Sequence, residues 1–513
     1  MPDKNFFITT PIYYPSGKPH MGHAYSSIIA DVFARFKRIE NYNVKFLTGT
    51  DEHGLKIQRE AEKNSKKPKE FCDEISLKFK NLSKTLDLSN DDFIRTTEKR
   101  HHRAVNEIWN RLVNSNDIYL SKYSGWYSVS DEAFYTEDEV ETVDGYKISK
   151  NSGSKVEWVE EESYFFRLSQ WQKPLLKFYS DNKNFILPES RRNEVISFVE
   201  NGLNDLSVSR KSFSWGIKVP SNNNHVIYVW LDALTNYLSA LNYPNVDNVN
   251  FKKFWPASLH LIGKDILRFH AIYWPAFLLA ADIKPPLKVY GHGWILSGEK
   301  KMSKSKGNIL DPLEIIDKYG LDPLRYYLIK EVSFGNDGNI SLEKLENCIN
   351  SDLANNYGNL CQRVISFNEK NFDLKVPDCS TLKEDDFLVL DSFNQEYSNI
   401  IESIDNQNIN FYVNFIQNQL FKSNKYFNDQ EPWKKKNDIK RLSTIVYVSL
   451  ELIRKVSIML YPIIPESTLK VLKIFNIDEK NINFHSVTKH DVLKSNQILS
   501  KLSILFKKVE KHD

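Results

Sequence analysis

Hydrophobic and polar positions follow two different spacings in the first part of the chain. Short apolar runs, "NFFITT" from Asn5 and "NVKFLTGTDEHG" from Asn43, lead into polar or glycine-bearing turns and predict two β-strands. Between them, residues 21–39 carry apolar side chains at the spacing of a half-buried helix, at Ile28, Ile29, Val32, Phe33 and Phe36. A strand, a helix and a second strand in this order predict a parallel βαβ unit.

The pattern changes twice further along the chain. Residues 116–225 are rich in Tyr, Trp, Ser and Glu and contain the strand-like "KVEWVEEESYFFRL", which predicts an inserted domain. The α/β pattern then returns in "HVIYVWLDAL", "SLHLIGKDIL" and "LKVYGHGWIL". From residue 346 to the end, long apolar periodicity with few glycines predicts a helix bundle. We therefore expect an interrupted α/β domain followed by an all-α domain.

Composition limits the classes of protein to consider. A chain of 513 residues is too long for one core, and a net charge of +3 means that contact with nucleic acid would use local basic surfaces. No two of the four cysteines form a C-x-x-C pair, so neither a disulfide framework nor a cysteine zinc knuckle is expected. The N-terminus lacks the apolar core of a signal peptide, and "FHAIYWPAFLLAA" is too short to span a bilayer. We expect a cytoplasmic protein without a membrane segment.

The predicted helix at 21–39 begins with the unusual tetrad "HMGH". His20 and His23 lie three apart, a spacing that places both imidazoles on one helix face, and they flank Gly22. In a doubly wound domain, ligands bind beyond the carboxyl ends of the strands, where helix N-termini attract phosphate. Glycine allows a flat group to approach the backbone. The tetrad therefore suits a nucleoside triphosphate, although alone it would more often be two surface histidines beside a turn.

A basic loop, "GEKKMSKSKG" at residues 298–307, is a second candidate element. Lys301, Lys304 and Lys306 alternate with two serines, and the loop follows the strand-like "LKVYGHGW". Because the loop follows this strand, we expect it to lie at the sheet end that also carries the two histidines. Flexible ammonium groups there could close over a triphosphate and stabilise the charge that moves onto a departing pyrophosphate. A lone basic loop would otherwise be a solvated surface turn.

Together, "HMGH" and "KMSKS" resemble the two signature motifs of class I aminoacyl-tRNA synthetases. Other stretches narrow the resemblance to the methionyl-tRNA synthetase family over essentially the whole chain; they are "PIYYPSGKPHMGH", "FLTGTDEHG", "YVWLDALTNYLSAL", "HLIGKDILRFHAIYWPA", "GHGWILSGEKKMSKSKGN" and "YGLDPLRYYL". The resemblance implies an α/β, Rossmann-type catalytic domain with an inserted connective domain, followed by a helical-bundle anticodon-binding domain. The implied ranges are 1–115 and 226–295 for the two halves of the catalytic domain, 116–225 for a connective domain without a zinc knuckle, 296–345 for the KMSKS loop and stem-contact region, and 346–513 for the anticodon-binding domain.

The resemblance also implies the reaction. L-methionine and ATP, with Mg²⁺ on the triphosphate, would give methionyl-adenylate and pyrophosphate. The methionyl group would then pass to the terminal adenosine of tRNA(Met), initiator and elongator alike, with release of AMP. His20, His23, Lys301 and Lys304 would be catalytic, and the ATP site would add Gly22 against adenine and Asp265 at the ribose. Catalysis would consist of positioning and charge stabilisation, without a side-chain nucleophile.

The implied methionine pocket combines apolar and polar side chains. An unbranched thioether favours an aromatic, apolar wall, which Trp230 and Ile266 can supply. Tyr14 and His270 would offer polar contacts to the sulfur, and Asp51 would pair with the substrate ammonium. The full implied set is Ile12, Tyr14, Asp51, Trp230, Leu234, Tyr237, Ile266 and His270. Leu234 stands where some relatives have proline. Without the resemblance, Trp230 and Tyr237 would be plain core and Asp51 a turn residue or helix cap.

Two stretches in the helical half indicate tRNA contacts. In "DLANNYGNLCQRV", Asn355, Asn359 and Arg363 are four apart and are expected along one helix face. The opposite face would pack the bundle through Leu353, Tyr357, Leu360 and Val364. In "EPWKKKNDIKR", Trp433 precedes three lysines, which suits a stacked base with neutralised phosphates. The resemblance implies that Asn359, Arg363 and Trp433 read the CAU anticodon. Without the resemblance, the polar stripe would be an ordinary solvated face.

Many relatives carry zinc knuckles built from paired cysteines in the inserted domain. Here "GWYSVSDEAFY" has Ser128 and Ser130 near where thiolates would stand, and "YKISKNSGSKVEW" also lacks cysteine. Because serine hydroxyls are poor zinc ligands, we expect a zinc-free insert. Aromatic packing should hold it together, through Trp126, Tyr127, Phe134, Tyr135 and Trp158.

Other classes of related protein would differ from this chain in recognisable sequence features. Synthetases for Ile, Leu or Val carry a larger editing insert, a cysteine-specific enzyme needs thiolate zinc ligands, and a small nucleotidyltransferase lacks a long helical half. A non-enzymatic tRNA-binding relative would have degraded signature motifs, whereas both are intact here. The chain ends after the helical bundle, without the extra domain by which some relatives dimerise, so we expect a monomer.

Overall fold

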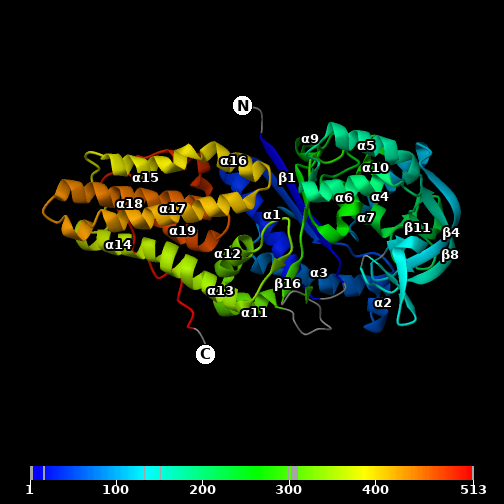
Figure 1. Cartoon of the computed structure of the whole chain (residues 1–513). Coiled ribbons are helices and arrows are strands. Elements are labelled where there is room, and N and C mark those ends of the chain that lie inside the picture. The colour runs from blue at the N-terminus through cyan, green and yellow to red at the C-terminus, as the bar shows by residue number, and fades with distance from the viewer. Residues whose placement is uncertain are drawn as a thin grey trace. The chain divides into compact units, whose positions relative to one another are not determined.

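A computed structural model of the chain describes residues 4–15, 18–131, 133–150, 152–297, 300–301 and 310–510 (Figure 1). The chain divides into two compact units. The sheet unit comprises residues 5–19 and 44–292, and the helical unit comprises residues 1–4, 20–43 and 293–513. The helix between the two strands of the predicted βαβ unit therefore belongs, by its contacts, to the helical unit.

The sheet unit is built on a six-stranded sheet with the order β3-β2-β1-β14-β15-β9. Its strands are β1 (Asn5–Tyr13), β2 (Asn43–Thr50), β3 (Asp92–Arg95), β9 (Ile186–Leu187), β14 (Leu259–Gly263) and β15 (Val289–His292). The pairs β2–β3, β1–β14, β14–β15 and β15–β9 are parallel. Continuous buried runs, such as Phe7 to Thr10 in β1, are typical of strands covered on both faces. This is the predicted doubly wound, Rossmann-type arrangement.

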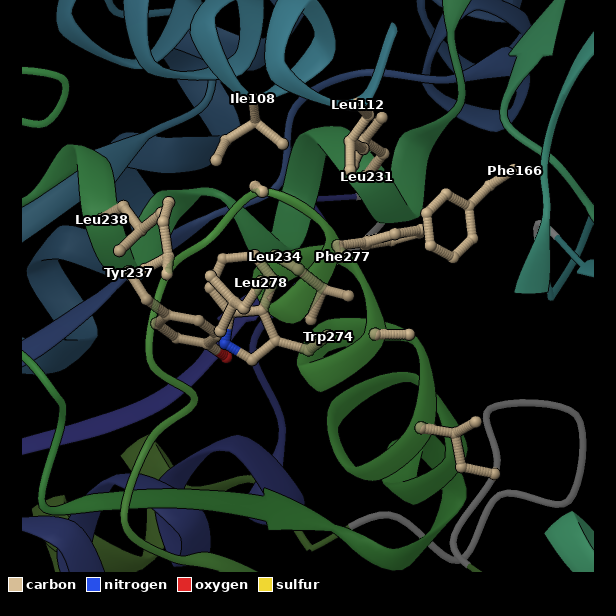
Figure 2. Packing of buried hydrophobic residues seen from close by; sticks show 14 of the residues in the cluster. Ile108, Leu112, Phe166, Leu231, Leu234, Tyr237, Leu238, Trp274, Phe277 and Leu278 are labelled. Carbon is tan, nitrogen blue, oxygen red and sulfur yellow. The ribbon is translucent and has the colours of Figure 1, made fainter. Parts of the chain in front are cut away.

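Helices cover this sheet and fill its core. They are α2 (Leu55–Lys63), α3 (Pro68–Thr85), α4 (Lys99–Asn114), α5 (Gln172–Asp181), α6 (Glu189–Glu200), α7 (Val229–Leu234), α8 (Asn236–Ser239), α9 (Val249–Phe254), α10 (Trp274–Ala280), the 3-10 turns η2 (Leu168–Trp171) and η3 (Lys264–Ile266), and the π-helical η4 (Phe269–Tyr273). Figure 2 shows Leu234 of α7, Tyr237 of α8 and Trp274 of α10 converging in one apolar cluster. Phe277 meets Phe166 edge to face, with ring centroids 4.9 Å apart.

A four-stranded antiparallel sheet, β10-β8-β4-β5, lies within the range expected for the insert. Its elements, with the hairpin β6–β7, are β4 (Ile118–Ser128), β5 (Ala133–Tyr135), η1 (Glu137–Glu139), β6 (Val140–Val143), β7 (Tyr146–Ser149), β8 (Glu157–Phe166) and β10 (Leu206–Ser207). A neighbouring sheet joins β11 (Ser209–Arg210), β12 (Lys218–Val219) and β13 (Asn222–Ile227). Strand β9 lies within the 116–225 range expected for the insert, but it pairs with β15 at the edge of the main sheet.

Aromatic side chains contribute unevenly to this insert. Tyr127 is buried, whereas Trp126 meets Trp158 edge to face at 5.2 Å and Trp158 is 51% exposed. The side chain of Phe134 lies outside the described residues. Tyr135 donates a hydrogen bond to Asp131, so it contributes a polar contact as well as packing. Aromatic packing is thus only part of what holds the insert together.

The helical unit begins with α1 (Met21–Ile39), the helix predicted from its apolar spacing. Its other helices are α11 (Pro312–Tyr319), α12 (Leu321–Glu331), α13 (Leu342–Cys348), η6 (Ile349–Gly358), α14 (Asn359–Phe372), α15 (Glu384–Gln395), α16 (Tyr397–Asp405), α17 (Ile409–Asp429), η7 (Pro432–Lys434), α18 (Ile439–Leu460), α19 (Pro465–Ile474), η8 (Glu479–Asn481) and η9 (Phe484–Thr488). Short strands β16 (Ile295–Ser297), β17 (Lys300–Lys301) and β18 (Gly338–Asn339) form a small sheet. Helices α14, α15, α17 and α19 pack against the buried helix α18 (Figure 1), which makes the predicted bundle.

A buried ion cluster fastens α1 to this bundle. Asp31 accepts hydrogen bonds from Arg35 at 2.8 Å and from Arg325 of α12 at 2.7 Å. Arg325 also donates to the carbonyls of Pro462 and Ile463, between α18 and α19. Asp31 and Arg325 are fully buried, so each charge depends on its partners for solvation.

The end of the chain departs from the predicted helix. Residues 489–510 contain no helix. Residues 496–499 run beside residues 374–376, where the Leu499 N–H donates to the Leu374 carbonyl at 2.7 Å and the Val376 N–H donates to the Gln497 carbonyl at 2.9 Å. Ile498 and Ile504 are each 71% exposed. The backbone groups of this segment therefore pair with another segment, and its apolar residues do not form one buried helix face. The prediction of helix through residue 513 was wrong here.

All four cysteines are free thiols; three are buried and Cys379 is exposed. Within the described ranges, none of the helices is both long and apolar enough to cross a membrane.

Candidate active site

The two histidines at the start of α1 cap the helix reciprocally. His20 is the N-cap, and its Nδ1 accepts the backbone N–H of Gly22 at 3.1 Å. Nδ1 of His23 accepts the backbone N–H of His20 at 3.1 Å. A Cβ at Gly22 would lie 3.1 Å from the His20 ring, so glycine leaves room for this fold of the side chain. The tetrad thus performs the task of a Ser-x-x-Glu capping box.

This capping fixes where each imidazole carries its proton. Because Nδ1 of both rings accepts a hydrogen bond, a neutral imidazole must hold its proton on Nε2. Burial, with a smaller effect of the His20 ring, lowers the pKa of His23 well below its usual range. The ring centroids are 3.8 Å apart. The N-terminus of α1 therefore presents two neighbouring rings with Nε2–H donors, a pattern that suits anionic oxygens.

The eight residues implied for the methionine pocket all lie in the sheet unit. Ile12, Tyr14, Trp230 and Ile266 pack against the cluster that contains Leu234 and Tyr237. Ile12 lies near the end of β1, Trp230 and Leu234 lie in α7, and Tyr237 lies in α8. Ile266 lies in η3 and His270 in the π-helical η4. Asp51 follows β2, is 8% exposed, and its N–H donates to the carbonyl of Tyr13 at 3.0 Å.

Tyr237 and His270 form a buried neutral pair. Nδ1 of His270 lies 3.0 Å from the Ile266 carbonyl and must donate to it. Burial lowers the pKa of His270 to about 4, so the ring is neutral and Nε2 accepts from the Tyr237 hydroxyl at 2.8 Å. Both ring nitrogens are thereby used within the protein. The His270 ring is therefore held in a fixed orientation between the Ile266 carbonyl and the Tyr237 hydroxyl.

Stacked rings line the same region. Trp230 lies against Phe269 with centroids 3.5 Å apart and planes 8° from parallel. Its indole Nε1 is buried, with no hydrogen-bond partner in the part of the chain that the structure describes. On the other side, His260 stacks on Tyr237 at 4.1 Å and is held by Thr9, which lies 2.8 Å from its Nδ1. Aromatic rings therefore pack against two of the predicted pocket residues, Trp230 and Tyr237.

The loop after β2 is anchored by buried charges. Nδ1 of His53 lies 2.6 Å from Asp232 of α7, and Asp232 also contacts His101 at 2.6 Å. Burial alone would raise the pKa of Asp232, but the two imidazoles lower it overall. The Tyr14 hydroxyl donates to the His53 carbonyl at 2.9 Å. The segment that carries Asp51 is thus tied to the helix that carries Trp230.

The remaining nucleotide candidates are positioned by short elements. Asp265 lies in η3, directly after β14; a Cβ at Gly263 would come within 2.5 Å of its Oδ1, so glycine permits this approach. Lys301 lies in β17, which pairs antiparallel with β16. Its side chain, and Lys304 with the rest of residues 302–309, lie outside the described residues.

Two of the four candidate tRNA residues, Arg363 and Trp433, meet near the end of α17. Arg363 donates to Asn428 at 2.7 Å and lies over the Phe427 ring at 5.4 Å. Trp433 meets the same ring edge to face at 6.3 Å and is 42% exposed. Asn355 and Asn359 are exposed. The residues predicted to face the bundle are buried, as expected: Leu353, Tyr357, Leu360 and Val364.

The helix that carries Asn355 differs from the expected α-helix. Residues 349–358 form the π-helix η6, in which hydrogen bonds join residues five apart. A Cβ at Gly358 would lie 3.0 Å from the Leu353 carbonyl, so glycine accommodates the wide turn. The α-helical face predicted for Asn355, Asn359 and Arg363 therefore begins only at Asn359.

Comparison with known proteins matches nearly all of the chain. Residues 6–365 match the model described as "tRNA synthetases class I (M)", and residues 376–513 match the "Anticodon binding domain of methionyl tRNA ligase". A methionine–tRNA ligase of Brucella suis is 47% identical, with 95% of each chain covered, and one of Rickettsia conorii is 46% identical, with 99% of this chain and 100% of the relative covered. The chain belongs to the class I methionyl-tRNA synthetase family. A solved Mycobacterium tuberculosis methionyl-tRNA synthetase in complex with methionyl-adenylate is 43% identical, with a TM-score of 0.95 over 98% of this chain and 99% of that one.

Several residues that support the predicted site in this methionyl-tRNA synthetase fold were not predicted from the sequence. His260 and Phe269 stack on pocket residues, and Asp232 anchors the loop at Asp51. Their contacts join segments up to 251 positions apart, as for His260 and Thr9. A buried carboxylate in the apolar "VWLDAL" and an aromatic neighbour of His270 were the available signals.

Proposed function

We propose that this chain attaches L-methionine to tRNA(Met) in two steps. In the first, a carboxylate oxygen of methionine attacks the α-phosphorus of ATP; the bond to pyrophosphate breaks and methionyl-adenylate forms. In the second, a hydroxyl of the terminal adenosine of tRNA attacks the carbonyl carbon, and AMP leaves. The observation that carries the proposal is the near full-length likeness to a relative solved with methionyl-adenylate.

The ATP site draws on the start of α1. His20 and His23, capped through Nδ1, would donate from Nε2 to phosphate oxygens. Gly22 would lie against adenine and Asp265 would hold the ribose. Lys301 and Lys304 would stabilise the charge of the leaving pyrophosphate, with Mg²⁺ bound to the triphosphate.

The methionine site draws on these stacked aromatic rings in the sheet unit. Trp230 and Tyr237 would pack the thioether, Asp51 would pair with the ammonium, and Ile12, Tyr14, Leu234 and Ile266 would complete the walls. Since the Tyr237 hydroxyl hydrogen is committed to His270, the Tyr237 hydroxyl would not donate to the side chain of the substrate.

The tRNA site draws on the helical unit. Arg363 and the two exposed asparagines, Asn355 and Asn359, would bond to base edges of the anticodon, while Trp433 would stack on a base. Both initiator and elongator tRNA(Met) would be substrates of a cytoplasmic, monomeric enzyme without structural zinc. We keep the division into a catalytic domain (1–115 and 226–295), a connective domain (116–225), a KMSKS and stem-contact region (296–345) and an anticodon-binding domain (346–513).

An ATP–pyrophosphate exchange assay with each amino acid tests this proposal. Exchange should depend on methionine and on no other amino acid, and charging should require tRNA(Met). Exchange with a different amino acid, or no exchange with any, would refute it.

A further inference from the structure

Two turns in the insert have the same spacing and the same internal hydrogen bond. In the first, the hydroxyl of Ser128 accepts the backbone N–H of Asp131 at 3.2 Å. In the second, the hydroxyl of Ser149 accepts the backbone N–H of Ser152 at 3.4 Å. Ser128 and Ser149 are fully buried. Two such turns, each with polar side chains at positions one and four, have the ligand spacing of paired C-x-x-C metal knuckles.

The Asp131 carboxylate lies between the two turns. Its Oδ2 accepts from Ser152 at 2.5 Å and from the Tyr135 hydroxyl at 2.8 Å, and its Oδ1 accepts from Ser154 at 2.7 Å. Hydrogen bonds to an ionised acceptor are about twice as strong as neutral ones. Ser130, which the sequence analysis placed near a ligand position, is exposed. The first turn therefore meets the second through Asp131.

This donor set does not fit structural zinc. Such sites use thiolate and imidazole ligands, whereas the four turn positions here hold three hydroxyls and one carboxylate. Both oxygens of that carboxylate already accept hydroxyl hydrogens. Across the described ranges, no group of three or more His, Cys, Asp or Glu side chains could hold a metal ion. The hydrogen bonds themselves tie the turns together.

A chain of contacts leads from these turns to the candidate methionine pocket. The N–H of Lys150, inside the second turn, donates to the carbonyl of Glu139 at 2.9 Å. The carboxylate of Glu139 pairs with Arg268 at 3.1 Å. Arg268 lies over the Phe198 ring at 4.0 Å and directly precedes the π-helical η4, which carries Phe269 and His270. The tie between the turns thus reaches the segment that shapes the pocket.

We propose that the Asp131 carboxylate replaces a metal ion as the tie between the two turns and that, through Glu139 and Arg268, it positions η4 at the methionine pocket. Asp131 and Glu139 are then positioning residues for methionine binding. This inference rests on the proposed function, because its readout is the affinity for methionine.

Asp131→Asn tests the tie, and Asp144→Asn is its matched control. Asp144 is an exposed carboxylate in the turn between β6 and β7, with a positive φ that asparagine tolerates. In methionine-dependent exchange, Asp131→Asn should raise the KM for methionine on the order of tenfold, the low end for residues that orient a site from behind. The KM for ATP and kcat should change less than threefold, and Asp144→Asn should match the wild type. An unchanged KM for methionine in Asp131→Asn would overturn the tie.

Glu139→Gln tests the route to the pocket without touching the turns. It should raise the KM for methionine to the same degree, and the double variant with Asp131→Asn should be no worse than either single variant. Additive effects, or no effect of Glu139→Gln, would overturn the route. Complete absence of exchange in the wild type would instead refute the proposed function.

A gain-of-metal variant tests the geometry of the turns. This variant combines four substitutions, S128C, D131C, S149C and S152C. It should bind one zinc per chain and have the wild-type KM for methionine. Elemental analysis measures the zinc content of this variant and of the wild type. No zinc in the folded variant, or stoichiometric zinc in the wild type, would overturn the inference.

Discussion

His20 and His23 cap the first turn of α1 through each other, so that one helix terminus is stabilised and two protons are fixed on Nε2 at the same time. An ordinary cap such as Ser or Asp would satisfy the backbone N–H groups but would leave no imidazole donor at the helix N-terminus. The two tasks, capping and donation, use different nitrogens of the same ring. They can therefore be separated by mutation.

Asparagine and glutamine at position 20 should separate capping from donation. The amide oxygen of His20→Asn can replace Nδ1 as the acceptor for Gly22 N–H, so the unfolding free energy should stay within about 0.5 kcal/mol of the wild type. Without the Nε2 donor, kcat for exchange should fall by about 100-fold. His20→Gln should instead lose about 1 kcal/mol of stability from the cap and keep more activity, because its amide nitrogen lies near the Nε2 position. Urea unfolding and exchange kinetics measure the two effects; equal exchange rates in both variants would contradict the assignment.

Tyr237→Phe should weaken methionine binding and destabilise the fold. It removes the donor to His270 Nε2 and leaves that buried acceptor unsatisfied, at a cost of about 1–3 kcal/mol. The KM for methionine should rise more than the KM for ATP. Tyr243→Phe is the control, because the Tyr243 hydroxyl is buried without a hydrogen bond to any described residue. If both variants behave alike, the Tyr237–His270 pair has no special role in the pocket.

The free energy of unfolding should decrease as the pH falls from about 6.5 to about 4, because of His270. Its pKa is about 4 in the folded chain and about 6.5 in an unfolded one, so protons bind the unfolded state preferentially between these values. The contribution of His270 is complete above pH 6.5 and is lost as the pH falls towards 4. It amounts to on the order of 3 kcal/mol. Urea midpoints measured from pH 7.5 to 4.5 should show a shallower decline in His270→Asn than in the wild type; His102 and His260, whose pKa values are also lowered, remain in both.

Asp31→Asn should destabilise the chain by about 3–5 kcal/mol, since it leaves Arg35 and Arg325 buried beside a neutral amide. Thermal or urea unfolding measures this loss. Glu466→Gln removes the exposed ion pair between Glu466 and Lys470 and should cost at most about 1 kcal/mol. If Asp31→Asn lowers the free energy of unfolding no more than Glu466→Gln does, the buried ion cluster does not stabilise the packing of α1.

Trp433→Ala should separate adenylate formation from charging. Exchange should be unchanged, whereas kcat/KM for tRNA should fall by the equivalent of about 1–3 kcal/mol, the scale of one lost base-stacking contact. Discrimination against altered anticodons should relax. Phe421→Ala is the matched control, because Phe421 is another exposed aromatic of the helical unit, on α17. Unchanged charging in Trp433→Ala would show that the indole only packs on Phe427.

Local patterns predicted the elements that depend on local forces. The bounds of α1 follow from its apolar spacing, and the buried stripe from Leu353 to Val364 follows from helical periodicity. Strand β9 and the extended segment at 489–510 could not be predicted in the same way, because each is defined by a partner far along the chain. The π-helices η4 and η6 also differ from the spacing that a sequence pattern assumes.

The residues of the candidate site also fall into those that could be predicted from the sequence and those that could not. Motifs supplied the residues that would touch substrates, such as Trp230 and Asp51. The groups that hold them, His260 beneath Tyr237 and Asp232 behind His53, are known only from contacts between distant segments. The hydrogen bond between Tyr237 and His270 likewise joins two motifs that are separate in the sequence.

The buried cluster at Asp31 also limits how this gene can be shortened or recombined. A polypeptide that ended at His292 would keep α1 and Arg35 but lose Arg325, so the buried Asp31 carboxylate would lose that guanidinium partner. A chimera that took its anticodon-reading half from a distant relative would meet the same deficit unless the donor also supplied residues 20–43. Residues 20–43 and residues 293–513 therefore depend on each other as one folding unit, although about 250 residues separate them in the sequence.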